Sequence, residues 1–212
     1  MGNRAIITTE RKNIGIYLHW NGGRDSVEGF LGYCKLQGYR GTLSDESYGF
    51  ARLVQVIGNF FGGSTCVGIT TSIGSVGDNG IYIIDDNWEI VGREGIGRLF
   101  TEQKEYDFKD IILAIDERQP EHVRLGEDYL AAEQVQASEL KTGDIVYERV
   151  SDSQPIQGIY VQGLWTEELS KAFGIYSNCV GEPYGLIKNK YSFEPDGKVT
   201  PQIFSGTVRR KR

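Results

Sequence analysis

Glycine is the residue that most limits what this chain can fold into. The sequence has 28 glycines among 212 residues, and the usual share of glycine in proteins is only about 7%. These glycines are scattered between short runs of isoleucine, valine and tyrosine and are not gathered in one tract. The pattern therefore predicts many short strands joined by tight turns.

The first part of the chain alternates between strand and helix patterns. Residues 4–10 and 14–20 are rich in β-branched and aromatic side chains, which predicts a β-hairpin. Apolar residues then recur at helical spacing over 25–37 and 45–61, and we expect Gly38 and the Gly62–Gly63 pair to end these helices. A strand at 64–72, a hairpin at 81–94 and a helix between Asp107 and Pro120 complete the pattern.

This order predicts an α+β fold, in which two or three helices pack on a mainly antiparallel sheet. From about residue 130 the sequence becomes β-rich, with turn signals between short apolar runs and one short helix expected at 166–176. We therefore predict an α+β domain over residues 1–127. Residues 128–212 are predicted to form a β-rich, small-barrel-like C-terminal domain or an extension of the first sheet.

The charge pattern bears on partners. The formal net charge is −6, and the last four residues are all basic. An acidic body differs from the basic face expected of a general nucleic-acid binder, and it suits docking onto a basic surface of another protein. Acidity that only maintains solubility is the simpler interpretation. We interpret the basic end as a solvated terminus, with phosphate contact as the alternative.

Cysteine usage and hydropathy indicate the compartment. Three cysteines are present, and none forms a CxxC pair, which excludes a zinc ribbon and a thioredoxin-like motif. The odd number and the lack of a leader-like segment predict a reducing cytoplasm. No apolar run is long enough for a membrane span. We expect Cys34 and Cys66 to be core residues.

The stretch "HWNGGRD" is the candidate functional site. A strand end, a glycine turn needing positive φ and a helix N-terminus together favour an anion, since free backbone N–H groups and the helix dipole attract negative charge. His19 would act as a general base with Asp25. A phosphate or carboxylate would be bound by the residues between them, Trp20, Asn21, Gly22, Gly23 and Arg24.

The same residues also have a purely structural interpretation. Alternation along the strand places Trp20 on the core face with Ile16 and Leu18. Asp25 is a good helix N-cap, and Glu28 three residues later approaches a capping box. Turn and cap chemistry is the commoner use of asparagine and aspartate, so both interpretations stay open at this stage.

Other candidate chemistry is weaker. Cys179 in a Gly/Pro-rich loop would need a histidine beside it to act as a nucleophile. The acid pairs 85–86 and 116–117 could assist a divalent metal, but Asp85-Asp86-Asn87 also has the composition of a hairpin turn, which we favour. No nucleotide-binding glycine motif is matched. We predict no metal and no cofactor.

The segments "MGNRAIITTE", "IGIYLHWNGGRDSVEGFL" and "VIGNFFGG" resemble the start of a family of Firmicutes proteins carried by prophages, plasmids and conjugative elements. The resemblance covers about the first 65 residues and brings no known catalytic residues. It implies an accessory role, of which anti-defence factors such as anti-CRISPR inhibitors are examples.

Three functional hypotheses follow from these observations. The leading one is an anti-CRISPR-like inhibitor that acts on a host defence nuclease, its ribonucleoprotein or its guide RNA. The second is a hydrolase or nuclease that uses His19 with Arg24 and Asp25. The third is a protein that sequesters a nucleotide signal, or another phosphate-containing ligand, at the same helix N-terminus.

Overall fold

The structure, a computed structural model, describes residues 3–41, 46–74, 78–95, 106–136, 139–141, 144–148, 154–160, 186–187 and 207–212. Helices and mainly antiparallel strands occupy separate stretches of these residues, so the predicted α+β class is confirmed. The chain divides into two units, residues 1–124 and 125–212. Each unit is described by itself.

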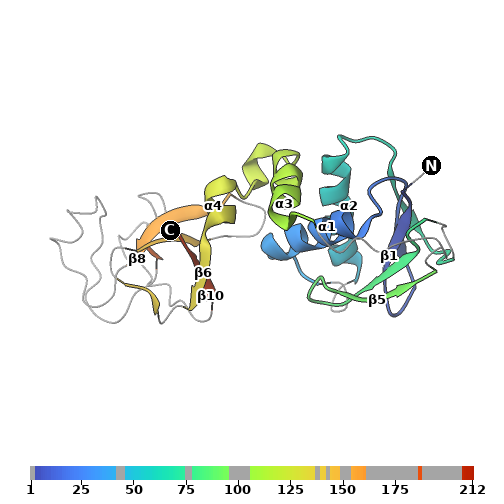
Figure 1. The fold of residues 1–212 in the computed structure, drawn as a ribbon, viewed down its shortest axis with the longest axis horizontal. Helices are drawn as coiled ribbons and strands as arrows, with labels where there is room; N and C mark the ends of the chain where they lie inside the picture. The colour runs from blue at the N-terminus through green and yellow to red at the C-terminus, as the bar shows by residue number, and fades with distance from the viewer. Residues whose placement is uncertain are drawn as a thin grey trace, which may run out of the picture. The chain divides into compact units, whose positions relative to one another are not determined.

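The first unit has the predicted order of elements, two strands, two helices, one strand, a hairpin and a helix. Figure 1 shows its strands beside α1 and α2. The elements are β1 (Ala5–Thr9), β2 (Gly15–Leu18), α1 (Arg24–Leu36), α2 (Glu46–Phe60), β3 (Val67–Thr70), β4 (Ile81–Ile84), β5 (Ile90–Glu94) and α3 (Phe108–Glu117).

Strand β1 is the centre of the first sheet. Within the described residues the strand order is β3-β2-β1-β4-β5, and every pairing is antiparallel except the parallel pairing of β1 with β4. All five residues of β1 are buried, as expected for a strand covered on both faces. The largest fully buried side chains around it include Ile6, Ile7, Ile16, Leu18, Phe30, Leu31, Leu53, Ile57, Tyr82 and Ile84.

Glycine ends both long helices, as predicted. Gly38 has a φ of 64° and donates to Lys35 O, while Tyr39 N donates to Cys34 O. This is the Schellman arrangement, in which a left-handed residue satisfies the last helical carbonyls. The same pair of bonds recurs after α2, where Gly62 also has a φ of 64°. The chain can therefore reverse sharply at both helix ends.

Helix α3 begins at its predicted cap. The Asp107 side chain accepts hydrogen bonds from the backbone N–H groups of Lys109 and Asp110. These bonds satisfy donors that have no partner inside the helix. The helix also packs very closely on α1, because a Cβ added to Gly29 would collide with Ile111 Cγ2.

A buried polar network joins α1 to α3. Tyr33 Oη donates to Asp116 Oδ1 at 2.6 Å, and Gln37 Nε2 donates to Tyr33 Oη at 2.7 Å. Gln37 Nε2 also donates to the carbonyl of Val123 at 2.8 Å. Burial, with help from the Asp116 bond, raises the pKa of the Tyr33 hydroxyl, so this group stays a hydrogen-bond donor.

The second unit is β-rich, as predicted. Its described elements are α4 (Glu127–Ala131), β6 (Glu133–Gln136), β7 (Ile145–Glu148), β8 (Ile156–Tyr160), β9 (Leu186–Ile187) and β10 (Thr207–Arg210). The described strands are ordered β6-β10-β7-β8-β9, with antiparallel pairings. The small-barrel closure stays a prediction. The helix predicted at 166–176 and Cys179 lie outside the described residues.

The interpretation of the basic C-terminus as a solvated end is wrong for Arg209 and Arg210, which are partly buried in β10, whereas Lys211 and Arg212 are exposed. Strand β10 lies between β6 and β7 and pairs with both. Arg209 lies 4.8 Å over the Tyr129 ring, and Arg210 Nε donates to Glu133 Oε1 at 2.8 Å. Lys211 Nζ forms an ion pair with Asp128 at 3.0 Å. These charges therefore stabilise the second sheet.

The close packing of α1 on α3 predicts that replacing glycine by alanine lowers stability at Gly29 but not at an uncrowded helical glycine. The Gly29→Ala variant should lose stability, since overpacking a helix contact typically costs about 1–3 kcal/mol and exceeds the helix-propensity gain of up to about 1 kcal/mol. Ile111 is β-branched and cannot easily turn its Cγ2 away. Urea unfolding followed by circular dichroism measures the change.

The control for Gly29 is Gly58, which lies in α2 with nothing within 4 Å of an added Cβ. There the same substitution should leave stability unchanged or raise it by up to about 1 kcal/mol. Equal losses in both variants would contradict the proposed helix contact.

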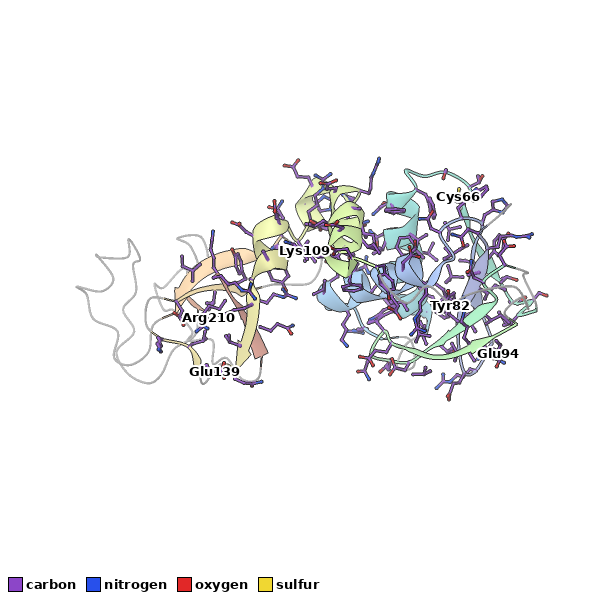
Figure 2. The ribbon with its side chains drawn as sticks, viewed as in Figure 1. Cys66, Tyr82, Glu94, Lys109, Glu139 and Arg210 are labelled. Atoms are coloured by element: carbon purple, nitrogen blue, oxygen red, sulfur yellow. The ribbon has the colours of Figure 1, made fainter. Side chains whose placement is uncertain are left out.

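The ion pairs of β10 predict that Arg210 contributes more to the second unit than Arg212 does. Arg210 (Figure 2) contacts acids on both sides of its strand, Glu133 and Asp144, whereas the Arg212 side chain is 78% exposed. The Arg210→Met variant should unfold at a lower temperature and be cut faster by protease within the second unit than Arg212→Met. Identical behaviour of the two variants would refute a structural role for this charge.

Candidate functional site

The predicted site lies where β2 ends and α1 begins. Because β1 and β2 are antiparallel, the residues before Ala5 lie beside the residues after Leu18. Gly22 N donates to Asn3 O at 2.8 Å, and the segment before β4 joins the same place, because Asn79 N donates to Arg4 O at 2.9 Å. Three segments that are distant in sequence thus meet at one end of the sheet.

The turn at Asn21-Gly22-Gly23 is held firmly. Tyr82, a buried residue of β4 (Figure 2), donates its hydroxyl to Gly22 O at 3.0 Å. We expect a glycine of this turn to have a positive φ, but the residue with a positive φ is Asn21, at 55°. The Asn21 side chain donates to Ser26 Oγ. Gly22 is needed for a different reason, since an added Cβ would lie 2.7 Å from Asn3 O.

His19 and Trp20 project to the surface beside Tyr17. The imidazole Nδ1 of His19 lies 3.1 Å from Tyr17 Oη, and its ring meets the Trp20 ring edge-to-face with centroids 5.1 Å apart. Trp20 is 43% exposed. The prediction that it shares the core face of Ile16 and Leu18 is wrong, because β2 ends at Leu18 and strand alternation stops there.

The predicted helix cap is also wrong. The N-cap of α1 is Gly23, with no side-chain cap hydrogen bond, and Asp25 lies inside the first turn. Glu28 does not complete a capping box but accepts from Arg24 Nε at 2.6 Å, an i,i+4 ion pair. Gly23 brings the backbone so near that its added Cβ would lie 2.6 Å from Asp25 Oδ1. The Asp25 carboxylate therefore lies at the helix start, where a negative charge is stabilised by the dipole.

These contacts bring only part of the predicted site together. Tyr17, which is half-buried, forms one group with the exposed side chains of His19 and Trp20, called the aromatic surface below. In the described part of the chain His19 and Asp25 share no hydrogen bond or ion pair, so the acid that would orient a catalytic histidine is not in contact with it. A general base needs such an orienting contact in the reactive complex.

The structure adds polar residues that the sequence did not single out. Asn79 is 1% exposed, and its side-chain amide donates to Asn3 Oδ1. Arg93 Nε donates to Asn79 O at 3.1 Å, and the Arg93 guanidinium lies 4.4 Å over the Tyr82 ring. The only sequence signal was the turn-like "DNG" at 78–80. Asn79 and Arg93 therefore contact Asn3 and Tyr82, the two residues that fix the turn.

The acid pairs have structural roles. Asp85 Oδ1 accepts from the backbone N–H groups of Asn87 and Glu89, both at 2.9 Å, which confirms the hairpin-turn interpretation. Asp116 is the buried partner of Tyr33. Across the residues that the structure describes, no group of three or more His, Cys, Asp or Glu could hold a metal ion.

The cysteines differ in environment. Cys34 is fully buried in α1, as predicted, and burial raises the pKa of its thiol, which disfavours the reactive thiolate. Cys66 is only partly buried, so the prediction that it is a core residue is wrong. Its sulfur accepts from Ser64 Oγ at 3.2 Å.

No family model, curated protein or solved structure matches this chain. In the described ranges, no helix combines the length and apolar character that crossing a membrane requires.

The close approach at Gly22 predicts that this turn cannot accept a side chain. In the Gly22→Ala variant the new Cβ would meet backbone atoms of Asn3 and Ala5 at 2.7–2.8 Å, so the turn must move away from β1. We expect a loss of about 1–3 kcal/mol in the free energy of unfolding. Urea unfolding measures it.

Gly74 is the control for Gly22, because nothing lies within 4 Å of its added Cβ. The Gly74→Ala variant should stay within about 0.5 kcal/mol of the parent. A Gly22→Ala variant as stable as the parent would show that the turn is not fixed as described.

Proposed function

We propose that the protein is an inhibitory binding protein whose contact point is the aromatic surface of Tyr17, His19 and Trp20. Its target would be a nucleic-acid-guided defence nuclease, or the ribonucleoprotein that this nuclease forms with its guide RNA. The setting of a mobile-element accessory protein is taken from the N-terminal resemblance. The choice of binding over catalysis rests on the contacts of the site residues.

The observation that carries the proposal is the exposure of Trp20 on a rigid support. Trp20 remains 43% exposed and lies against the His19 ring, so its indole is accessible to a partner as part of an aromatic group. Tryptophan and tyrosine are the side chains most enriched among residues that dominate the energy of protein interfaces. The turn that follows is fixed by Asn3 and Tyr82, so little ordering entropy would be lost on binding.

The charge distribution fits a protein target better than a nucleic acid. The whole chain carries a net charge of −6, which would steer it toward a basic nucleic-acid channel. Two of its clustered cations, Arg210 and Lys211, are already paired with acids. The C-terminal basic residues therefore contribute less to a phosphate-binding surface than their sequence indicates.

The two alternative functions receive less support from the same contacts. A hydrolase would need His19 and Asp25 to act together, yet His19 is bonded to Tyr17. A phosphate at the α1 N-terminus would meet the Asp25 carboxylate, which lies at the helix start, and Arg24 is paired with Glu28. Like charges at one site oppose anion binding.

The experiment is inhibition of a purified, guide-loaded nuclease from a Firmicutes CRISPR system by the parent protein and the Trp20→Ala variant. Truncation of an interface anchor typically costs about 2 kcal/mol or more. The variant should therefore need at least about tenfold more protein for half-inhibition. Tyr48→Ala, which removes an exposed aromatic residue of α2, is the control and should inhibit like the parent.

A second substitution separates binding from catalysis. His19→Phe keeps an aromatic ring and removes the acid–base group. An enzyme that depends on His19 would lose about 10²-fold or more in rate, whereas an aromatic contact should retain most of its inhibition. Full inhibition by Trp20→Ala would refute the proposed contact. Cleavage of the purified guide RNA by the parent, together with loss of inhibition in His19→Phe, would favour the nuclease hypothesis.

A further inference from the structure

Strand β3 forms one edge of the first sheet. Its partner among the described strands is β2, in the register Leu18↔Val67 to Gly15↔Thr70. The exposed side of this strand, Val67–Thr70, is called the β3 edge below. An edge strand presents unpaired backbone groups, which can act as a template for another strand.

The register defines which backbone groups point outward. His19 N donates to Cys66 O at 2.9 Å, so His19 and Cys66 form a hydrogen-bonded pair. Such pairs alternate with non-bonded pairs in an antiparallel ladder. Gly68 therefore faces β2, and the N–H and C=O groups of Val67 and Ile69 point away from it. The Ile69 side chain is also 64% exposed.

The two edges of the sheet differ in charge. The sequence from residue 53 to residue 77 has no charged side chain, so nothing on the β3 edge repels a second uncharged strand. The opposite edge, β5, carries Arg93 and Glu94, and its ladder shifts register between Ile83 and Ile84. Charges and irregular register are the features by which edge strands avoid pairing.

We propose that the β3 edge pairs with the β3 edge of a second copy of this chain, antiparallel about a two-fold axis at Gly68. A strand that pairs with this edge should be uncharged, extended and rich in β-branched residues. The edge's own residues Val67, Ile69 and Thr70 have that character. An axis at Gly68 places Val67 of one copy opposite Ile69 of the other, so all the outward backbone groups of both residues pair. The assembly closes as a symmetric dimer.

The charge and size of the surface determine how this dimer should behave. Each copy carries a net charge of −6, so the copies repel one another at low salt and associate more tightly as salt screens that repulsion. The paired strand has only four residues, which makes the interface small and the association weak. The inference uses the outer backbone groups of β3, whereas the proposed inhibitory function uses the aromatic surface that lies beside β3.

Sedimentation over about 10 µM to about 1 mM protein tests the proposal, because weak association appears only as concentration rises. The parent should shift from one chain to two, more completely in high salt. The Ile69→Lys variant should remain a single chain throughout. Val91→Lys, which charges an exposed apolar residue of the opposite edge, should dimerise like the parent.

Three outcomes would overturn the proposal. The first is a parent that stays a single chain at every concentration, and the second is a dimer that survives Ile69→Lys. The third is a dimer that Val91→Lys also abolishes. If the parent is a single chain but Ile69→Lys removes nuclease inhibition, the occupant of the edge is a strand of the target instead. Circular dichroism confirms that each variant is folded.

A cross-link provides a test that does not depend on Ile69. Gly68 accepts a side chain, because its added Cβ would make an ordinary 3.8 Å contact with Tyr17. In a background that carries Cys66→Ser and Cys179→Ser, Gly68→Cys should form a disulfide-linked dimer on mild oxidation, since the two copies of residue 68 face each other across the axis. The matched control is Val91→Cys in the same background. Equal cross-linking of both variants, or none at residue 68, would refute the two-fold pairing.

Discussion

The hydrogen bond from Tyr33 to Asp116 fixes helix α1 against helix α3, and the rest of the first unit depends on that placement. Both groups are buried, so separating them would break a hydrogen bond of a buried carboxylate and take this acceptor away from the buried hydroxyl proton. Gly29 allows the two helices to approach closely enough for the bond to form. Because α1 is held at this distance, its N-terminus meets the end of the sheet, where Asn3 and Tyr82 fix the turn at Gly22.

Much of the first unit could be predicted because its signals are local. The Asp107 cap, the glycines that end α1 and α2, and the Asp85 turn each act within a few residues of themselves. The parallel pairing of β1 with β4 joins residues about 75 positions apart, and only packing decides it. Packing also decides the position of β10. Its basic residues have the composition of a solvated end, and only the fold brings acids of β6 and α4 beside them.

The secondary structure around the candidate site follows from the sequence, but the contacts of its side chains do not. The sequence indicated a strand end, a turn and a helix start, and the structure places all three where expected. Strand alternation predicts a core position for Trp20, but the alternation stops at Leu18, where β2 ends. Residue type predicts Asp25 as the cap, but Gly23 occupies that position and Asp25 lies inside the first turn. The supporting residues Asn79 and Arg93 come from distant segments and carry no local signal.

The position of β10 has a consequence for the order of folding. The hairpin of β1 and β2 joins neighbouring residues, and every strand of the first sheet has been synthesised by residue 94. In contrast, the facing edges of β6 and β7 can pair only after β10 has been synthesised, and β10 follows them by some sixty residues or more. Non-local pairing of this kind slows folding. During synthesis, the first sheet can therefore form while the second still exposes two open strand edges, the interval in which the nascent chain is most prone to aggregate.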